Sequence, residues 1–474
     1  MIQERLKALR AEMEKRGITV YVVPTADFHE SEYVGDHFKA RKFITGFTGS
    51  AGTAVITLDE AGLWTDGRYF VQAENQLKDS TVTLYRMGEE GVPTVDEFVK
   101  DRLKEGGCLG FDGRVVNGTW GGRLEKIAAE KNVSMHVTED LIDLIWEDRP
   151  ALSKQPLFIL EEKYSGKSTA DKIADLRKAM KENGADVHIL TSLYDIAWLL
   201  NIRGNDIDYV PVVLSYLVLN ETECIWFLQE EVVDDKIRAY LEENHITTKP
   251  YDAIYDYVPE IPADAVVLMN RGTVNYRIVN SLDKAIKVVD KPNPTELMKA
   301  VKNKTEVDNT RAAHVKDGVA FTKFMYWLKT NIGKIPMTEI SASDYLEARR
   351  REQDNFIELS FNTICAYGAN AAMMHYAATP ESDAELKPEG FLLVDSGGHY
   401  FEGTTDITRT MALGPITDEM RLHFTTVCRS NMNLAHAKFL YGCTGLTWIF
   451  YPAVHSGRWA LTINAAPDTA LVMC

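Results

Sequence analysis

The sequence of 474 residues lacks several features that would assign it to a broad functional class. Its six cysteines form no C-x-x-C pair, and scattered thiols in a chain of this length favour a reducing compartment over a disulfide framework. No stretch is apolar over enough residues to span a membrane, and the charged N-terminal segment has no signal-peptide core. We therefore expect a cytoplasmic protein with no membrane partner.

Basic residues are also in short supply. The 52 lysines and arginines are outnumbered by 69 aspartates and glutamates, which gives a formal net charge of -17. Proteins that bind nucleic acid or anionic lipid use a basic surplus to neutralise phosphates, so we expect neither partner. The hydrophobic content of 45% is ordinary for a globular protein. The length exceeds that of one ordinary core and predicts two or three domains.

The signatures of three common enzyme classes are absent. There is no H-E-x-x-H zinc motif, because the stretch "HESEY" that begins at His29 has the wrong spacing. There is no G-x-S-x-G nucleophile motif and no phosphate-binding G-x-x-x-x-G-K-[ST] loop. The stretch "GSAGT" that begins at Gly49 is a tight glycine turn, and such turns alone are weak signals of function.

One helix–glycine–strand pattern occurs twice along the chain. The segment "LRAEMEKRG" at residues 9–17 matches "LRKAMKENG" at residues 176–184, and an apolar strand follows each. This repetition predicts two related α/β domains. A third domain is expected to begin near residue 290, where Asn293 can cap a helix whose first residue is Pro294. A long helix should follow from about Thr305, with capping-box spacing to Asp308.

Two aspartates near the end of the chain suggest half of a metal site. The stretch "VDSGGHYFEGTTDITRTMALG" at residues 394–414 places Asp395 at the end of an apolar strand and Asp406 at the start of an alternating one. The bend between them would bring the carboxylates together in a hairpin. Such a pair needs a cation or a shared proton, and its hard oxygens suit Mn, Mg or Zn-type dications. For two isolated aspartates the alternative is favoured, in which Asp395 caps a turn and Asp406 pairs with Arg409 or another basic residue.

The whole stretch resembles the catalytic domain of the Xaa-Pro aminopeptidases, also called aminopeptidase P. These belong to the creatinase/prolidase/methionine-aminopeptidase group with the pita-bread fold, and their pattern D-S-G…G-T-T-D-x-T-R-T is present here. The segments "SEYV", "GFTGSAGTAVIT" (46–57) and "WTDGRYFVQAE" (64–74) look like the first domain of the three-domain form. The segment "FNTICAYGANAAMMHY" (361–376) looks like the one that precedes the metal strands.

The resemblance covers most of residues 1 to about 445 and implies an α/β fold class. Two related creatinase-type N-terminal α/β domains would be followed by an incomplete pita-bread α+β catalytic domain. The expected borders are 1–148 for the first domain, 149–290 for the second and 291–446 for the first half of the catalytic domain. Residues 447–474 do not resemble the family.

The resemblance also implies a role for four residues. Asp395 and Asp406 match the two aspartates of a dinuclear site that holds two Mn or Zn ions. His375 in "MMHY" matches a histidine that contacts the scissile peptide and helps to stabilise the tetrahedral intermediate. Arg68 in "TDGRY" matches an arginine that reaches toward the substrate site from the first domain. Without the family, His375 would be read as a core residue, and Arg68 as half of a surface ion pair with Asp66.

The implied activity is metal-dependent hydrolysis that releases an N-terminal residue preceding proline. The substrates would be peptides with proline in the second position, and the family form allows a homodimer. A prolidase- or creatinase-type relative is the alternative enzyme. A different class also stays open, namely an inactive relic or a binding protein built from the two creatinase-type domains. Metal content distinguishes these hypotheses.

Three further ligands of the family site are not found in this sequence. The family uses a histidine in a "GTGHG" stretch and two later glutamates, whereas the histidines after Asp406 have no matching context. These histidines are His423, His436 and His455. We therefore expect impaired metal binding and doubtful activity for this chain.

The tail from about Leu446 is interpreted as a shifted reading frame, caused by mutation or by sequencing error. The codons that can encode the residues from Leu461 onward permit "GTGHG" when they are read from their third base. The nucleotide sequence decides this interpretation, because it must show Gly-Thr-Gly-His-Gly in the alternative frame.

Overall fold

The computed structural model describes residues 1–440, 442 and 443. The expectation for residues 447–474 therefore concerns residues outside the described ones. The chain divides into two compact units. Unit 1 comprises Met1–Thr65 and Ala73–Val307, and unit 2 comprises Asp66–Gln72 and Asp308–Cys474. Each unit is described by itself.

Unit 1 contains two six-stranded sheets with the same strand order and the same orientations. The first runs β4-β3-β2-β1-β5-β6 and the second β12-β11-β10-β8-β13-β14. The central strand β1 pairs antiparallel with β2 and parallel with β5, and β8 pairs in the same way with β10 and β13. The prediction of two related α/β domains is confirmed. The strands of the first sheet are β1 Val20–Pro24, β2 Thr53–Thr57, β3 Ala61–Thr65, β4 Thr83–Arg86, β5 Cys108–Phe111 and β6 Ser134–His136. Those of the second are β8 Val187–Leu190, β10 Ser215–Leu219, β11 Cys224–Leu228, β12 Ile246–Pro250, β13 Val266–Met269 and β14 Lys287–Asp290.

The repeated helix opens each of these domains. In α1 (Ile2–Lys15), Leu6, Leu9 and Met13 are buried at the three- and four-residue spacing of one helix face. Its equivalent α7 (Thr169–Glu182) buries Ile173, Leu176 and Met180 in the same way. The glycine that follows each helix adopts a positive φ, +67° at Gly17 and +63° at Gly184, which is the conformation that ends a helix at low steric cost. The other helices of unit 1 are α2 Ala40–Thr45, α3 Phe70–Leu77 (which begins in unit 2), α4 Val95–Arg102, α5 Gly118–Glu130, α6 Glu162–Ser165, α8 Leu193–Leu200, α9 Asp235–Glu243, α10 Ile254–Tyr257, α11 Tyr276–Ser281 and α12 Pro294–Ala300.

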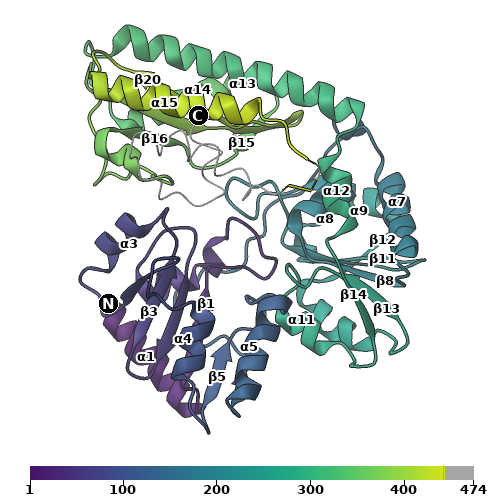
Figure 1. Ribbon diagram of the computed structural model, residues 1–474. Helices are drawn as coiled ribbons and strands as arrows, with labels where there is room; N and C mark the ends of the chain where they lie inside the picture. Colours follow the sequence, from purple (N-terminus) through teal and green to yellow (C-terminus); the bar gives the residue numbers. More distant parts are fainter. Residues whose placement is uncertain (441, 444–474) are drawn as a thin grey trace. The chain divides into compact units, whose positions relative to one another are not determined.

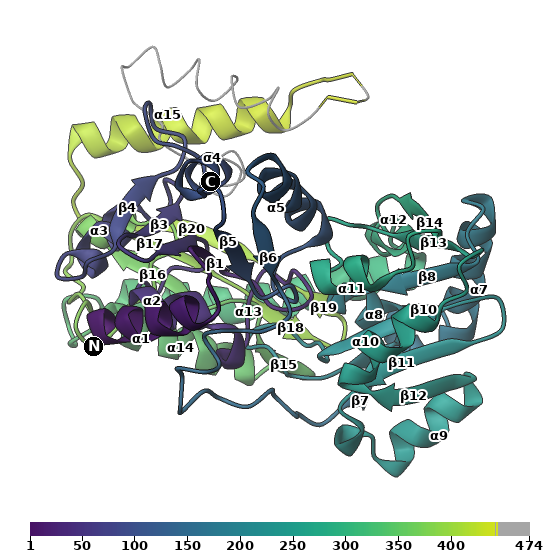
Figure 2. The same cartoon turned by 90° about the horizontal axis from the view of Figure 1, so that it is seen from below.

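The two related domains share one interface inside unit 1. Helices α5 and α11 lie side by side (Figures 1 and 2), and an isolated β-bridge joins Asn117 to Asn275, the residues that cap them. The buried cluster of the second domain also contains Phe28 and Phe38 of the first. This shared core explains why the two domains form a single unit.

The sequence "GLWTDGRYF" (62–70) predicts one strand, and the observed strand ends earlier. Strand β3 ends at Thr65, the chain then turns, and helix α3 begins at Phe70. The turn is held by Asp66, whose carboxylate accepts hydrogen bonds from the backbone and side chain of Arg68. The segment Asp66–Gln72 groups with unit 2, although the strands on either side of it belong to unit 1.

The two helices that follow residue 290 lie where the sequence predicts them, but the residues that cap the second helix differ from the prediction. Helix α12 begins at Pro294 after the N-cap residue Asn293, as expected, and the Glu296 carboxylate accepts a hydrogen bond from the Asn293 backbone. The long helix α13 spans Lys304–Asn331. Its capping box is formed by Asn303 and Glu306. The Asn303 side chain accepts from the Glu306 backbone N–H at 2.9 Å, and the Glu306 carboxylate accepts from the Asn303 backbone N–H at 2.8 Å. The expected pair of Thr305 and Asp308 was wrong, because the helix starts before Thr305.

Unit 2 is built on an antiparallel sheet with helices on both faces. The sheet has the order β16-β17-β20, with β16 Ile364–Tyr367, β17 Phe391–Ser396 and β20 Ile407–Ala412. Leu392 and Val394 of β17 pack in one cluster with α13 and α14 (Glu339–Arg351), whereas Phe391 stacks on Phe424 of α15 (Asp418–Ala435). Residues of alternate parity face opposite sides of a strand, so α13 and α14 cover one face and α15 the other (Figure 2). A smaller sheet has the order β15-β18-β19, with β15 Phe356–Leu359, β18 Gly398–Tyr400 and β19 Gly403–Thr404.

No helix within the described part of the chain combines the length and the hydropathy needed to cross a membrane.

Candidate functional site

The two predicted metal-ligating aspartates lie at the same end of one antiparallel strand pair. In the register of β17 and β20, Asp395 is opposite Thr408 and Ser396 is opposite Ile407, so Asp406 immediately precedes the paired residues. The Thr408 hydroxyl donates a hydrogen bond of 2.6 Å to Asp395 Oδ1. The predicted hairpin therefore forms, and the small strands β18 and β19 occupy its bend.

The electrostatics of this pair are those of two carboxylates in close proximity. Burial, together with the adjacent Asp406 carboxyl, raises the pKa of Asp395 to about 6, and the hydrogen bond from Thr408 opposes this change. Asp395 is 7% exposed, whereas Asp406 is exposed to solvent. A half-buried pair of like charges is a suitable place for a cation, because an ion between the carboxylates would remove their repulsion. The alternative that Asp406 merely pairs with Arg409 has no support from the contacts of Arg409, which donates to the Thr408 carbonyl.

A buried network anchors β17 from the opposite face. Arg350 of α14 and Asp317 of α13 form a fully buried ion pair, with Arg350 Nε 2.6 Å from an Asp317 oxygen. Arg350 also donates to the Ser396 hydroxyl at 3.1 Å, and Tyr400 donates to Asp317 at 3.1 Å. Because Ser396 directly follows Asp395, this network fixes the end of the strand that carries the carboxylate.

His375 lies on the loop between the short turn Gly368–Ala372 and β17. Its ring Nδ1 is 3.1 Å from the Tyr69 hydroxyl, and the two rings meet edge to face with centroids 5.6 Å apart. Partial burial lowers the pKa of His375, the nearby Arg68 lowers it further, and Asp66 opposes the change. The histidine is exposed at the surface of unit 2, so it is not the core residue that a lone histidine would suggest.

Arg68 forms the ion pair with Asp66 that the sequence offered as an alternative. Its Nε and Nη2 donate to the two carboxylate oxygens at 2.9 and 2.8 Å. Burial alone would raise the pKa of Asp66, but the hydrogen bonds from Arg68 outweigh this effect and lower it. The pair lies close enough to His375 to change its pKa, so the structure brings Arg68 and His375 together within unit 2.

The two carboxylates are of the ligand type that divalent cations prefer. Asp395 and Asp406 offer hard carboxylate oxygens, which are the ligands that such ions prefer. Within residues 1–440, 442 and 443, no group of three or more His, Cys, Asp and Glu side chains is arranged to hold a metal ion. The described residues therefore offer only these two carboxylates as candidate ligands.

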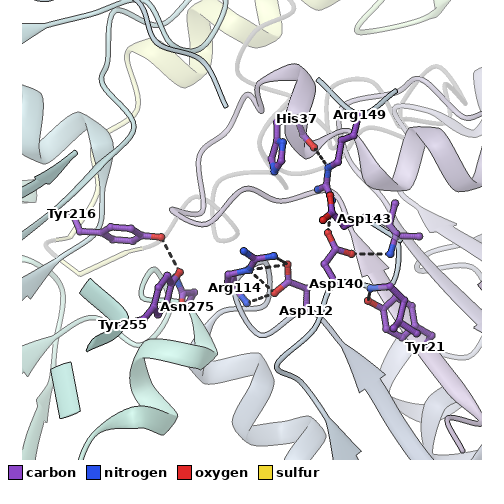
Figure 3. Close-up of polar contacts among 12 residues, drawn as sticks. Tyr21, His37, Asp112, Arg114, Asp140, Asp143, Arg149, Tyr216, Tyr255 and Asn275 are labelled. Atoms are coloured by element: carbon purple, nitrogen blue, oxygen red, sulfur yellow. Dashed lines mark hydrogen bonds and ion pairs between the residues drawn. The ribbon is translucent and has the colours of Figure 1, made fainter. Parts of the chain in front are cut away.

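A second group of buried charges, in unit 1, is paired internally (Figure 3). Arg114 bonds Asp112 through Nε and Nη2, each at 3.0 Å, and Arg149 bonds Asp140 at 2.6 Å. Nearby, Tyr216 bonds Tyr255 at 3.0 Å, and Asn275 donates to Tyr255 at 3.3 Å. Because these groups are paired with one another, we assign them a structural role.

A pocket of about 190 Å³ with mixed polar and apolar lining also lies in unit 1, and no predicted site residue lines it. Its lining includes Glu32, Arg41, Lys42 and Tyr209. Arg41 is largely committed to the loop around it, because it donates to the Thr25 hydroxyl at 2.9 Å and to the carbonyls of Phe47 and Gly49.

Sequence reasoning missed the residues that hold His375. Tyr69 contacts its ring, and Glu339 accepts a 2.7 Å hydrogen bond from the hydroxyl of Tyr376, the next residue. Tyr69 is adjacent to Arg68 in the "TDGRY" segment, which was the available signal. Nothing in the sequence near Glu339 distinguishes it from other helix-opening acids.

Family models match the chain over nearly its whole described length. The Creatinase/Prolidase N-terminal domain matches residues 5–145 and, in a second model, residues 148–306. Metallopeptidase family M24 matches residues 308–445. The segment that contains Asp395, Asp406 and His375 is therefore an M24 segment.

Curated relatives and a solved structure agree with these matches. The "Probable Xaa-Pro aminopeptidase P" of Neurospora crassa is 38% identical over 93% of this chain, which spans 66% of that protein. Its counterpart in Laccaria bicolor is 39% identical over 93% of this chain and 70% of that protein. The crystal structure of X-prolyl aminopeptidase from Caenorhabditis elegans, described as a cytosolic enzyme with a di-nuclear active site, superposes with a TM-score of 0.93 at 32% identity. It covers 97% of this chain and 78% of that one. The chain therefore belongs to the Xaa-Pro aminopeptidase family of M24 metallopeptidases.

Proposed function

We propose that the chain carries the catalytic centre of a metal-dependent Xaa-Pro aminopeptidase, which releases an N-terminal residue preceding proline. The observation that carries the proposal is the pair of facing carboxylates, Asp395 and Asp406, inside the M24 segment. The substrates are peptides with proline in the second position. The acidic net charge of -17 argues against a nucleic-acid partner.

Each residue of the site has a distinct part in this proposal. Asp395 and Asp406 would hold two divalent ions, Mn or Zn, and His375 would donate a hydrogen bond to the scissile carbonyl oxygen as negative charge develops on it. Arg68, oriented by Asp66, lies beside the histidine and favours its neutral form. The ions, when bound, act as Lewis acids and lower the pKa of water.

We further propose a cytoplasmic location, in keeping with the cytosolic enzyme of Caenorhabditis elegans, and the domain borders 1–148, 149–290 and 291–446. A homodimer is the proposed assembly. Two carboxylates are too few ligands to hold two ions tightly, so we propose that activity is reduced and depends on added metal.

The test combines metal content with hydrolysis. After dialysis, elemental analysis should find well under one Mn or Zn ion per chain. With added Mn²⁺, the chain should release the first residue of an Xaa-Pro-Pro tripeptide and leave Xaa-Ala-Pro intact. Asp395→Asn and Asp406→Asn should each lower this rate by about 100-fold or more, since even indirect supports of a metal site are worth about 10–100-fold.

The matched control is Asp418→Asn, because Asp418 opens helix α15 and its side chain is fully exposed. It should hydrolyse like the unaltered chain. Equal rates in the Asp395 variant would show that the pair is not the centre. No hydrolysis at any metal concentration would favour the binding protein over the enzyme.

A further inference from the structure

Among the residues that the structure describes, Tyr69 is the partner that fixes the orientation of the His375 ring. The Tyr69 hydroxyl lies 3.1 Å from Nδ1, and Tyr69 itself is only 2% exposed. Both residues belong to unit 2. A ring held at Nδ1 directs Nε2 to the opposite side, away from the tyrosine. This nitrogen is the one left to meet a substrate.

The backbone that carries His375 is held as firmly as its ring. Glu339 opens helix α14 and is fully buried. Its carboxylate accepts hydrogen bonds from the Tyr376 hydroxyl at 2.7 Å, from Asn370 Nδ2 at 3.0 Å and from the Ala384 backbone at 3.1 Å. These three donors come from the loop on both sides of His375. The loop therefore has little freedom to swing the histidine away from Tyr69.

The protonation state of the ring makes the identity of its donor nitrogen important. Partial burial and the neighbouring Arg68 lower the pKa of His375, so the neutral ring prevails near pH 7. A neutral imidazole has one donor nitrogen and one acceptor nitrogen. Which nitrogen carries the proton then decides whether Nε2 can donate to a carbonyl oxygen.

We propose that Tyr69 is the positioning residue of His375: its hydroxyl donates to Nδ1 and holds the tautomer in which Nε2 carries the proton. The Arg68 guanidinium lies 5.4 Å from the centre of the Tyr69 ring, and a nearby positive charge makes a phenol a better donor. Only one part of this inference rests on the proposed function, namely that Nε2–H donates to a scissile carbonyl. The tautomer itself does not.

The test is histidine tautomer assignment by long-range ¹H–¹⁵N NMR on ¹⁵N-histidine-labelled chain without metal or substrate. A His375→Gln variant identifies the His375 signals among the eleven histidines. We expect the unaltered chain at neutral pH to show a protonated Nε2 and a hydrogen-bonded, unprotonated Nδ1. Tyr69→Phe should give a mixture of tautomers and a higher pKa for His375, because the lost bond stabilised the neutral ring.

The matched control is Tyr367→Phe. The Tyr367 hydroxyl donates to the Glu389 carbonyl at 2.9 Å in the same unit, so its loss should leave the His375 signals unchanged. A protonated Nδ1 in the unaltered chain would overturn the proposal even if the Tyr69 variant fails to fold. The proposal would also be overturned if Tyr69→Phe left the His375 signals unchanged.

Hydrolysis separates this proposal from the proposed function. If the chain is active with added Mn²⁺, Tyr69→Phe should lower kcat by about tenfold with little change in KM, as expected for a bond used in the transition state. The expected tautomer without any hydrolysis would refute the proposed activity alone. Activity with an unchanged tautomer in Tyr69→Phe would refute the positioning role alone.

Discussion

Lys172 is the most heavily buried lysine side chain in the described part of unit 1, at 1% exposure. Its Nζ donates to the Asn201 side chain at 2.7 Å and to the Trp198 carbonyl at 2.8 Å. Burial, together with the nearby Arg203, lowers the pKa of Lys172 to about 7, and Glu306 opposes the change. Lys167 and Glu162 act more weakly, in opposite senses. The amine is therefore neutral in the folded protein over much of the range in which the unfolded chain is charged.

This shift predicts a specific pH dependence of stability. Between about pH 7 and the ordinary lysine pKa near 10.4, the unfolded state binds one more proton than the folded state. Stability then rises with pH across that window and is lowest below pH 7, where the folded chain must bury an ammonium group. Lys172→Met should flatten this part of the curve in urea unfolding measured from pH 6 to pH 9.5. The exposed Lys178 provides the control, since Lys178→Met should leave the slope as it is.

At the residue scale, the sequence predicted the two carboxylates but not the residue that contacts His375. Asp395 and Asp406 could be predicted because a hairpin follows from local strand and bend signals. Tyr69 could not be paired with His375, since the two are separated by 306 positions and no local pattern encodes such a contact. The assignments of these residues as catalytic or metal-binding stay predictions.

The helices α5 and α11 show how two elements join the related domains. Gly121 of α5 lies so close to α11 that an added Cβ would be 2.2 Å from the Tyr276 ring. At the next position, Gly122 has nothing within 4 Å of an added Cβ. The same substitution at adjacent positions of one helix should therefore have opposite effects.

Gly121→Ala should lower the free energy of unfolding by about 1–3 kcal/mol, because it overpacks the interface. Gly122→Ala should raise it by about 0.5–1 kcal/mol, because alanine favours the helix without a clash. Urea denaturation monitored by fluorescence measures both. Equal effects of the two substitutions would mean that α5 does not pack on α11 in solution.

Elements with a strong local pattern were predictable, and their ends were less so. The spacing of Leu6, Leu9 and Met13 fixed one helix, and its repetition fixed a second. The strand across "GLWTDGRYF" was predicted too long, because apolar residues stand on both sides of Asp66, whose side chain turns the backbone. The capping box of α13 was misplaced by two residues for a similar reason, since both Asn303 and Thr305 have the required spacing to an acid.

At the scale of the whole molecule, the two units differ in how much apolar surface they bury. The domains of unit 1 share two buried clusters across their interface, one that contains Phe28 and Phe38 of the first domain and one that contains Tyr276 of the second. In unit 2, helix α15 buries only Thr426 and Ser430 among its described residues, while Met420, Leu422, Phe424 and Met432 are 39–57% exposed. Among the described residues, the sheet β16-β17-β20 has three strands, against six in each of the two large sheets of unit 1. Regions with few buried apolar contacts open at lower free energy.

We therefore predict that unit 2 opens before unit 1. In hydrogen exchange followed by mass spectrometry, peptides from β17 should exchange on the order of 10- to 100-fold faster than those from β8, which corresponds to about 1.4–2.8 kcal/mol in opening free energy. These strands are matched, because each is flanked by two strands of its own sheet and is largely buried. Limited proteolysis should first cut after about residue 307 and leave a resistant fragment of unit 1. Equal protection of β17 and β8 in a soluble monomer would contradict the prediction, because it would require unit 2 to be as stable as a unit with two shared cores.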